Sequence, residues 1–318
     1  MSEGNFIRES GVTRVVDVSD EDERNFLEIF RDKFQGEVKE SLEIEKTPEI
    51  LELINDFNKN LKQFFQRYGV EWMEVPAGNI HLLDLSSLSE EQKTRIKFDG
   101  SFKSIVQHLV LIDYSDKDFS ALAVTLVHEM IHFNSFQSWQ KGQRGAESLP
   151  MTNKETNEKL FLNQRRQGIN VFDVNGRSFF REIDEAVVTE LAIEFDQEFF
   201  SKTKGLKDEV ALRDQIFSEA APDPSKRRLV RKIIEHPENE EDRRFQIFSY
   251  KYGEERKKFW EIVKEIFEKN RDEFTTEEDV FNLFVQACMT GRLLPLARIY
   301  EKTFGPGSFR KLGEETKK

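Results

Sequence analysis

The sequence contains a single cysteine, Cys288, and lacks long apolar runs. One cysteine in 318 residues excludes an internal disulfide. No apolar stretch reaches the roughly 18–20 residues that a membrane-spanning helix needs. The first residues also lack the basic segment and apolar run of a signal peptide. Together these absences predict a protein of the reducing cytoplasm that has no membrane partner.

Basic charge is also scarce. The chain has 48 Lys and Arg against 60 Asp and Glu, which gives a net charge of −12. Nucleic acids and anionic membranes are bound by basic surfaces, so we expect neither as a partner. The one basic run, SKRRLVRK at 225–232, is interpreted as the solvated face of a helix.

A hydrophobic fraction of 37% with 29 Phe residues is enough for a substantial core. Short alternating or β-branched runs predict strands at 12–18, 70–75, 79–85 and 103–114, and Asn175-Gly176 predicts a hairpin. Helices are predicted from Ser19, from Pro48 after the cap Thr47, and over 121–133 after a Ser115–Asp118 capping box. Further helices are predicted at 181–200, 206–220, 226–236, 253–269, 275–290 and 292–303.

The order of these elements predicts an α+β fold, because strict alternation of strands and helices is absent. We divide the chain into an N-terminal lobe, 1–139, and a mainly helical C-terminal lobe, 140–318, that together form one catalytic unit. The polar stretch 140–168 is interpreted as a mobile loop or lid.

The segment ALAVTLVHEMIHF (121–133) carries the chemistry. It is apolar apart from Thr125 and the triplet His128, Glu129 and His132. Residues four apart on a helix lie one above the other, so both imidazoles reach the same point, a spacing that suits Zn²⁺. Glu129 lies beside the open position of such an ion and can take a proton from its water. A surface helix with the same triplet by chance would carry charged residues on its other faces.

Two histidines do not hold a catalytic zinc, and a third ligand is needed. One known arrangement uses H-E-x-x-H-x-x-G-x-x-H, but here Ser135 and Ser138 occupy the last two defining positions. The other takes a glutamate from a later helix. In FFREIDEAVVTEL we choose Glu185, because Val188, Thr189 and Ala192 give it a small or apolar surround.

Two other glutamates of this segment, Glu182 and Glu190, remain alternatives to Glu185. Glu190 stands in an i, i+4 row with Glu194 and Glu198, which is typical of a solvated helix edge. Thr189, one turn after Glu185, is a candidate to hydrogen-bond a ligand imidazole from behind.

With these residues the sequence resembles the zincin superfamily of metallopeptidases and, within it, the glutamate-ligand group, the gluzincins. The resemblance rests on TLVHEMIHF and IDEAVVTEL, with 52 residues between His132 and Glu185. Residues around the histidines are uncharged, as in the family's extended motif, although Asn134 replaces a usual apolar residue. The resemblance implies a small mixed sheet packed on the active-site helix. Its edge strand would hold an extended peptide, and we expect SIVQHLVLIDY (104–114) to be that strand.

The implied activity is zinc-dependent hydrolysis of a peptide or protein substrate. Zn²⁺ would lower the pKa of its water and polarise the scissile carbonyl, and Glu129 would act as general base. Members of the family add a Tyr, His or Arg that stabilises the oxyanion. Tyr250, Tyr252 and His236 are candidates here, although each is also compatible with a packing or surface role; His81 and His108 are interpreted as structural.

Two other functions fit the same residues. The fold could serve as a binding or regulatory module whose metal is structural, although such a site has no use for Glu129. A metal hydrolase acting on a non-peptide bond is the other alternative, since fold and metal alone do not determine the substrate.

Overall fold

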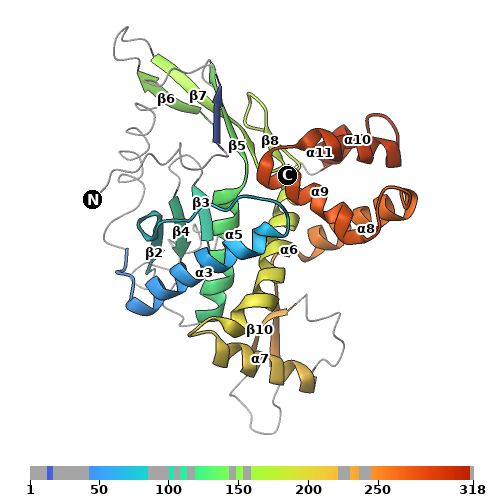
Figure 1. The fold of residues 1–318 in the computed structure, drawn as a ribbon. Coiled ribbons are helices and arrows are strands. Elements are labelled where there is room, and N and C mark those ends of the chain that lie inside the picture. Colours follow the sequence, from blue (N-terminus) through green and yellow to red (C-terminus); the bar gives the residue numbers. More distant parts are fainter. Residues whose placement is uncertain are drawn as a thin grey trace.

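The computed structural model describes residues 13–16, 43–84, 100–103, 108–112, 119–142, 148–152, 159–220, 230–235 and 245–315. Helices and strands are both present and do not alternate, so the α+β class is confirmed. In Figure 1, α5 and α6 occupy the centre, strands β2, β3 and β4 lie beside α5 towards the N-terminus, and α8 to α11 form a helical group on the other side of α6.

The described helices carry the core. The α-helices are α3 (Pro48–Gln66), α5 (Phe119–Asn134), α6 (Arg181–Phe199), α7 (Lys207–Ala220), α8 (Gly253–Lys269), α9 (Glu277–Thr290), α10 (Leu293–Phe304) and α11 (Ser308–Glu315). Two 3₁₀ turns, η2 (Ala77–Asn79) and η4 (Phe200–Lys202), accompany them. Helix α3 begins as the sequence predicts, since Thr47 accepts a hydrogen bond from the backbone of Ile50 and Pro48 occupies the first turn.

The described strands form three sheets. They are β1 (Thr13–Val16), β2 (Ile80–Leu83), β3 (Gly100–Lys103), β4 (His108–Ile112), β5 (Gln137–Gly142), β6 (Ser148–Thr152), β7 (Lys159–Gln167), β8 (Asn170–Phe172), β9 (Ser178–Phe179), β10 (Val230–Glu235) and β11 (Phe245–Ser249). The largest sheet has the order β1-β5-β7-β8-β9, with β6 also on β7. The second has the order β2-β4-β3, and β10 pairs with β11.

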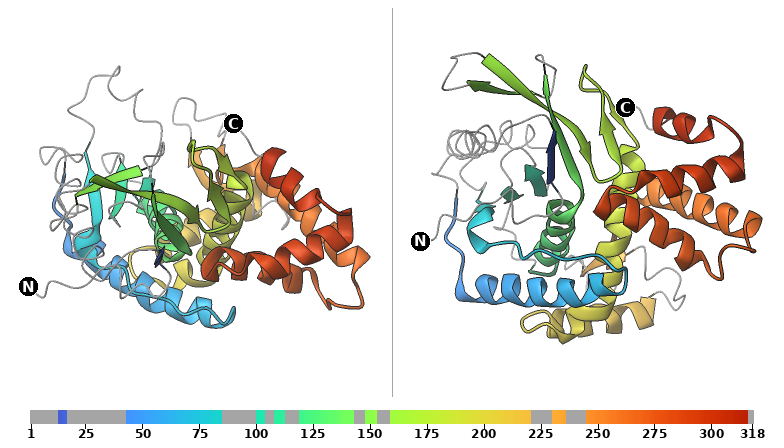
Figure 2. Two further views of the ribbon diagram at one scale, coloured as in Figure 1. Left: turned by 90° about the horizontal axis from the view of Figure 1, so that it is seen from above. Right: turned by 45° about the horizontal axis from the view of Figure 1, so that its top comes forward.

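Most buried apolar residues between Ile50 and Leu312 belong to one cluster, in which α3, α5, α6, α8 and α9 pack together. Figure 2 shows α3 lying across α5 and α6, with the β2-β4-β3 sheet beside α5 and the helices α8 and α9 beside α6. The boundary proposed at 139/140 falls inside β5. The two lobes therefore share one core, with the α5–α6 pair at its centre.

The prediction of a loop or lid over 140–168 is wrong for the described residues of that stretch. They contribute to β5, β6 and β7, and Leu162 in β7 is fully buried. A sheet with one solvated face needs apolar residues on only one side, so a polar composition does not exclude a strand. The Asn175-Gly176 hairpin is confirmed: it joins β8 to β9, and Gly176 has φ 75°.

The strand predicted at 70–75 is also wrong, and two buried asparagines explain why. The amide of Asn58 pairs with both backbone groups of Val75, and the amide of Asn134 pairs with both backbone groups of Met73. These side chains satisfy the backbone in place of a neighbouring strand. Asn134, the departure from the zincin motif, therefore anchors the end of α5.

Among the predictions for the C-terminal part of the chain, some are confirmed and one is wrong. The helices at 206–220, 253–269, 275–290 and 292–303 are confirmed as α7 to α10. The helix at 226–236 is wrong for its described residues, because Val230–Glu235 forms β10, which pairs antiparallel with β11 and suits β-branched Val230, Ile233 and Ile234. The helix from Ser19 and the Ser115–Asp118 cap lie outside the described residues. Of the described helices, none has the length and apolarity that crossing a membrane requires.

Candidate metal centre

The triplet lies on α5, and its two histidines contact side chains of α6. Val127, Met130 and Ile131 are fully buried on the same helix, as the apolar sequence predicts. His132 and Glu129 are buried and His128 is half-buried. Helix α6 runs alongside and brings Glu185 to the two histidines across 52 intervening residues.

Three ligand atoms form a nearly equilateral triangle. Nε2 of His132 lies 3.1 Å from Nε2 of His128 and 3.3 Å from Oε2 of Glu185. The third edge, from His128 Nε2 to the same oxygen, is 3.4 Å. Ligands at roughly 2.0–2.1 Å from a tetrahedral zinc ion lie about 3.3 Å from one another. The triangle therefore has the dimensions of three corners of a zinc tetrahedron.

Hydrogen bonds explain this triangle less well than a cation does. Hydrogen bonds can form along two edges of the triangle. Along the third edge, two N–H donors or two lone pairs then face each other, which is unfavourable. A divalent ion accepts a lone pair from all three atoms together. In the described part of the chain, this is the group of His, Cys, Asp and Glu residues whose ligand atoms meet within 4.8 Å of one another.

Electrostatics in this cluster favour positive charge. Burial alone would lower the pKa of His132, but the charges of Glu185, Glu129 and Asp184 and the hydrogen bond to Glu185 raise it to about 9. Burial would raise the pKa of Glu185, yet the two histidines hold it well below its usual range. The carboxylates thus attract a cation to the point where both imidazoles converge.

Asp184, the residue before Glu185, lies behind His132 and was missed by sequence reasoning. Nδ1 of His132 is buried without a hydrogen-bond partner, and Oδ2 of Asp184 lies 4.0 Å from it, about 1 Å beyond hydrogen-bonding distance. A ligand histidine commonly donates its second N–H to a carboxylate, which orients the ring. Thr189, the residue expected in this role, has a buried hydroxyl without a partner.

A tight turn holds Asp184 in place. The backbone N–H of Ile169 donates to Oδ1 of Asp184 at 2.7 Å, and Gly168 has φ +59°. A Cβ atom on Gly168 would lie 2.1 Å from that oxygen, so this position must be glycine. Arg166 donates to the carbonyls of Gly168 and Gly291, which ties the turn to the end of α9.

We expect Asp184→Asn to weaken zinc binding by about 10–100-fold, because it removes the carboxylate that faces Nδ1 of His132. Competition with a chromophoric chelator at fixed pH measures the change. Thr189→Val is the matched control: it alters a buried polar group on the same helix and should leave the affinity unchanged. Equal losses in both variants would contradict the role of Asp184.

Tyr252 is the oxyanion candidate that reaches this centre. Its ring stacks on the His128 ring at 6.3 Å between centroids and 15° between planes. Burial raises the pKa of its phenol, and so do the charge and hydrogen bond of Glu185 and the charge of Glu129. Tyr252 therefore keeps its proton and lies beside both carboxylates of the site.

Tyr250 lies elsewhere. Its hydroxyl donates to Asp196, eleven residues after Glu185 on α6 and thus about 16 Å further along the helix axis. His236 lies outside the described residues. His81 hydrogen-bonds Glu43 through Nδ1 at 2.7 Å, in agreement with a structural role. His108 lies in β4.

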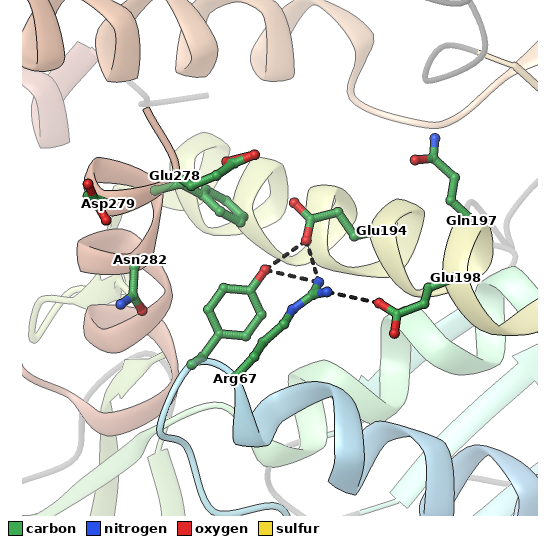
Figure 3. A pocket seen from close by; sticks show the side chains of 9 residues that line it. Arg67, Glu194, Gln197, Glu198, Glu278, Asp279 and Asn282 are labelled. Carbon is green, nitrogen blue, oxygen red and sulfur yellow. Dashed lines mark hydrogen bonds and ion pairs between the residues drawn. The ribbon is translucent and has the colours of Figure 1, made fainter. Parts of the chain in front are cut away.

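The alternative ligands on α6 do not join the triangle. Glu182 is half-buried one turn before Glu185, and Glu190 is buried in an ion pair with Arg256. The solvated edge predicted for Glu190, Glu194 and Glu198 is therefore wrong at Glu190, whereas the side chain of Glu198 is 40% exposed. Figure 3 shows Glu194 and Glu198 paired with Arg67 in a pocket. The two ion pairs are 2.6 and 2.9 Å long, and the pocket has a volume of about 560 Å³.

That pocket faces away from the candidate metal centre. Glu194 is nine positions after Glu185, which at about 100° per residue places it on the opposite side of α6. The hydroxyl of Tyr68 also donates to Glu194, at 2.7 Å. Helix α6 therefore carries one set of carboxylates on the side of the candidate metal centre and another on the α3 side.

Searches for related proteins found no matching family model, no matching curated protein and no matching solved structure.

Proposed function

We propose that this protein is a zinc-dependent peptidase of the glutamate-ligand zincin type. The observation that carries the proposal is the triangle of His128, His132 and Glu185, whose edges of 3.1 to 3.4 Å match those of a zinc tetrahedron. The fit is supported by the buried Nδ1 of His132, which faces a carboxylate as in other histidine-ligated metal sites.

Zn²⁺ bound by these three side chains would supply Lewis acidity, since it lowers the pKa of a coordinated water to about 7 and polarises a carbonyl. The chain's own residues provide the remaining chemistry. Glu129 accepts the proton of the attacking water and then delivers it to the leaving amine. The Tyr252 phenol donates a hydrogen bond to the oxygen on which negative charge develops.

A peptide substrate is favoured over other hydrolysable bonds by the sheet beside α5. The edge-strand role expected for 104–114 is wrong for its described residues 108–112, because β4 pairs with β2 on one side and β3 on the other. Among the described strands of this sheet, β2 and β3 form the two edges. Leu83 of β2 already bridges Glu43, whereas β3 contacts α5. An extended peptide can add to such an edge through backbone hydrogen bonds.

Metal content and its removal test the proposal. The purified chain should contain about one zinc ion and hydrolyse members of a mixed peptide library, read out by mass spectrometry of new termini. Chelation followed by desalting should abolish cleavage, and one equivalent of Zn²⁺ should restore it, whereas Mg²⁺ should not. Zinc binding without cleavage of any peptide pool would favour a binding module, and the absence of zinc binding would exclude both functions.

A further inference from the structure

Tyr252 occupies a conformation that its own side chain does not favour. It is the N-cap of α8, with φ 60° and ψ 35°, and its side chain makes no capping hydrogen bond. A non-glycine residue in the left-handed region persists only when its surroundings hold it there. The residues that flank Tyr252 therefore determine where its ring lies.

A first clamp holds the chain two residues before Tyr252. The buried hydroxyl of Tyr250 donates to Asp196, which is itself almost fully buried on α6. Arg213 of α7 donates to both oxygens of the same carboxylate, at 2.8 and 3.0 Å. Asp196 is thus fixed from two directions, and Tyr250 is fixed to α6.

A second clamp holds the first turn of α8. Nε of Arg256 donates to Oε1 of Glu190 at 2.5 Å, and both side chains are at least nine-tenths buried. The backbone N–H of Arg256 donates to the carbonyl of Tyr252 at 2.8 Å. The guanidinium also lies 5.9 Å from the centre of the Tyr250 ring, so the two clamps contact each other.

Both clamps attach to α6, the helix that also carries Glu185. Glu190 and Asp196 belong to the same rigid element as the third candidate ligand. The position of Tyr252 relative to that ligand is therefore set by two buried polar contacts, one on each side of it in the sequence. Neither contact involves the candidate ligands themselves.

We propose that Tyr250 and Arg256 are positioning residues that hold the Tyr252 phenol at the candidate metal centre and influence hydrolysis only through it. The proposal rests on the proposed function for its catalytic consequence. Displacement of a catalytic group by about 1 Å can cost about 100-fold in rate, so small changes in either clamp should be visible in kcat.

Tyr250→Phe removes one hydroxyl and leaves the ring and the Asp196–Arg213 pair in place. We expect kcat to fall by about tenfold or more, with KM and zinc content unchanged. In a Tyr252→Phe background the same substitution should have no further effect, because its target is gone. Tyr68→Phe is the matched control: it removes a hydrogen bond from a tyrosine to another α6 carboxylate, Glu194, on the opposite side of the helix, and should leave kcat unchanged.

A second readout needs neither zinc nor activity. With 3-fluorotyrosine incorporated at position 252, the ¹⁹F resonance of the metal-free chain should shift or broaden in Tyr250→Phe and in Arg256→Lys but not in Tyr68→Phe. Unchanged resonances in both clamp variants would overturn the proposal, as would equal losses of kcat from Tyr250→Phe with and without Tyr252. If wild type hydrolyses no peptide, the proposed function fails. The fluorine signal still tests whether Tyr250 and Arg256 position Tyr252.

Discussion

Glu129→Gln should keep its zinc and lose peptide hydrolysis by about 10²–10⁴-fold, the contribution expected of a general base. Glutamine has nearly the same shape and cannot accept the proton. The carboxylate is buried beside His132 and Tyr252, and its charge contributes to the raised pKa of both residues. Its loss therefore removes the proton acceptor without removing a ligand.

Steady-state hydrolysis of the best library peptide measures this effect, with zinc content determined on the same sample. Glu198→Gln provides a control at a partly exposed carboxylate that pairs with Arg67 on the other side of α6. That variant should retain full activity. If Glu129→Gln were as active as wild type with zinc bound, another base would be required and the proposed mechanism would be wrong.

Glu185→Gln should weaken zinc binding by more than about 100-fold, a larger loss than the one expected for Asp184→Asn. The reason is that it removes a ligand, whereas Asp184→Asn removes a carboxylate that faces a ligand histidine. The substitution also removes the charge that holds a cation between two imidazoles. Activity should fall with zinc occupancy and be partly restored by excess Zn²⁺. Isothermal titration and chelator competition provide the affinity, and hydrolysis at increasing zinc concentrations tests the rescue.

Glu182→Gln is the matched comparison for this result, since Glu182 is half-buried on the same helix one turn earlier. It should bind zinc as wild type does. If Glu185→Gln left the zinc affinity unchanged and Glu182→Gln lowered it, Glu182 rather than Glu185 would be the third ligand. Loss of affinity in both variants would indicate a general effect of charge on α6.

The local parts of the site were predictable because they depend on short-range geometry. Four-residue spacing on a helix aligns His128 with His132 whatever surrounds them. The apolar neighbours of the triplet predicted burial, and α5 is buried. The prediction of Glu185 as the third ligand required only that the small and apolar face of α6 pack on α5. The two helices do pack together.

The partners of these residues were not predictable, because they depend on which surfaces meet. Thr189 and Asp184 were equally available in the sequence, but the turn at Gly168 holds Asp184 behind His132. Tyr250 and Tyr252 are two residues apart, yet one bonds Asp196 and the other stacks on His128. The carboxylates of Glu190, Glu194 and Glu198 pair with Arg256 and Arg67. Their spacing in the sequence predicted only that they would face solvent.

The sequence by itself determined an apolar helix with two aligned imidazoles and a carboxylate, an α+β composition and a later helix able to donate a glutamate. The spacing of residue types in the sequence indicates which side chains lie on one face of a helix or strand. This depends only on local backbone geometry. Only the tertiary structure decided which carboxylate lies behind His132, which tyrosine reaches the site and which strands form the edges of the sheet beside α5. Those outcomes depend on contacts between segments far apart in the chain, and the periodicity of one segment does not specify the surface that another segment brings to it.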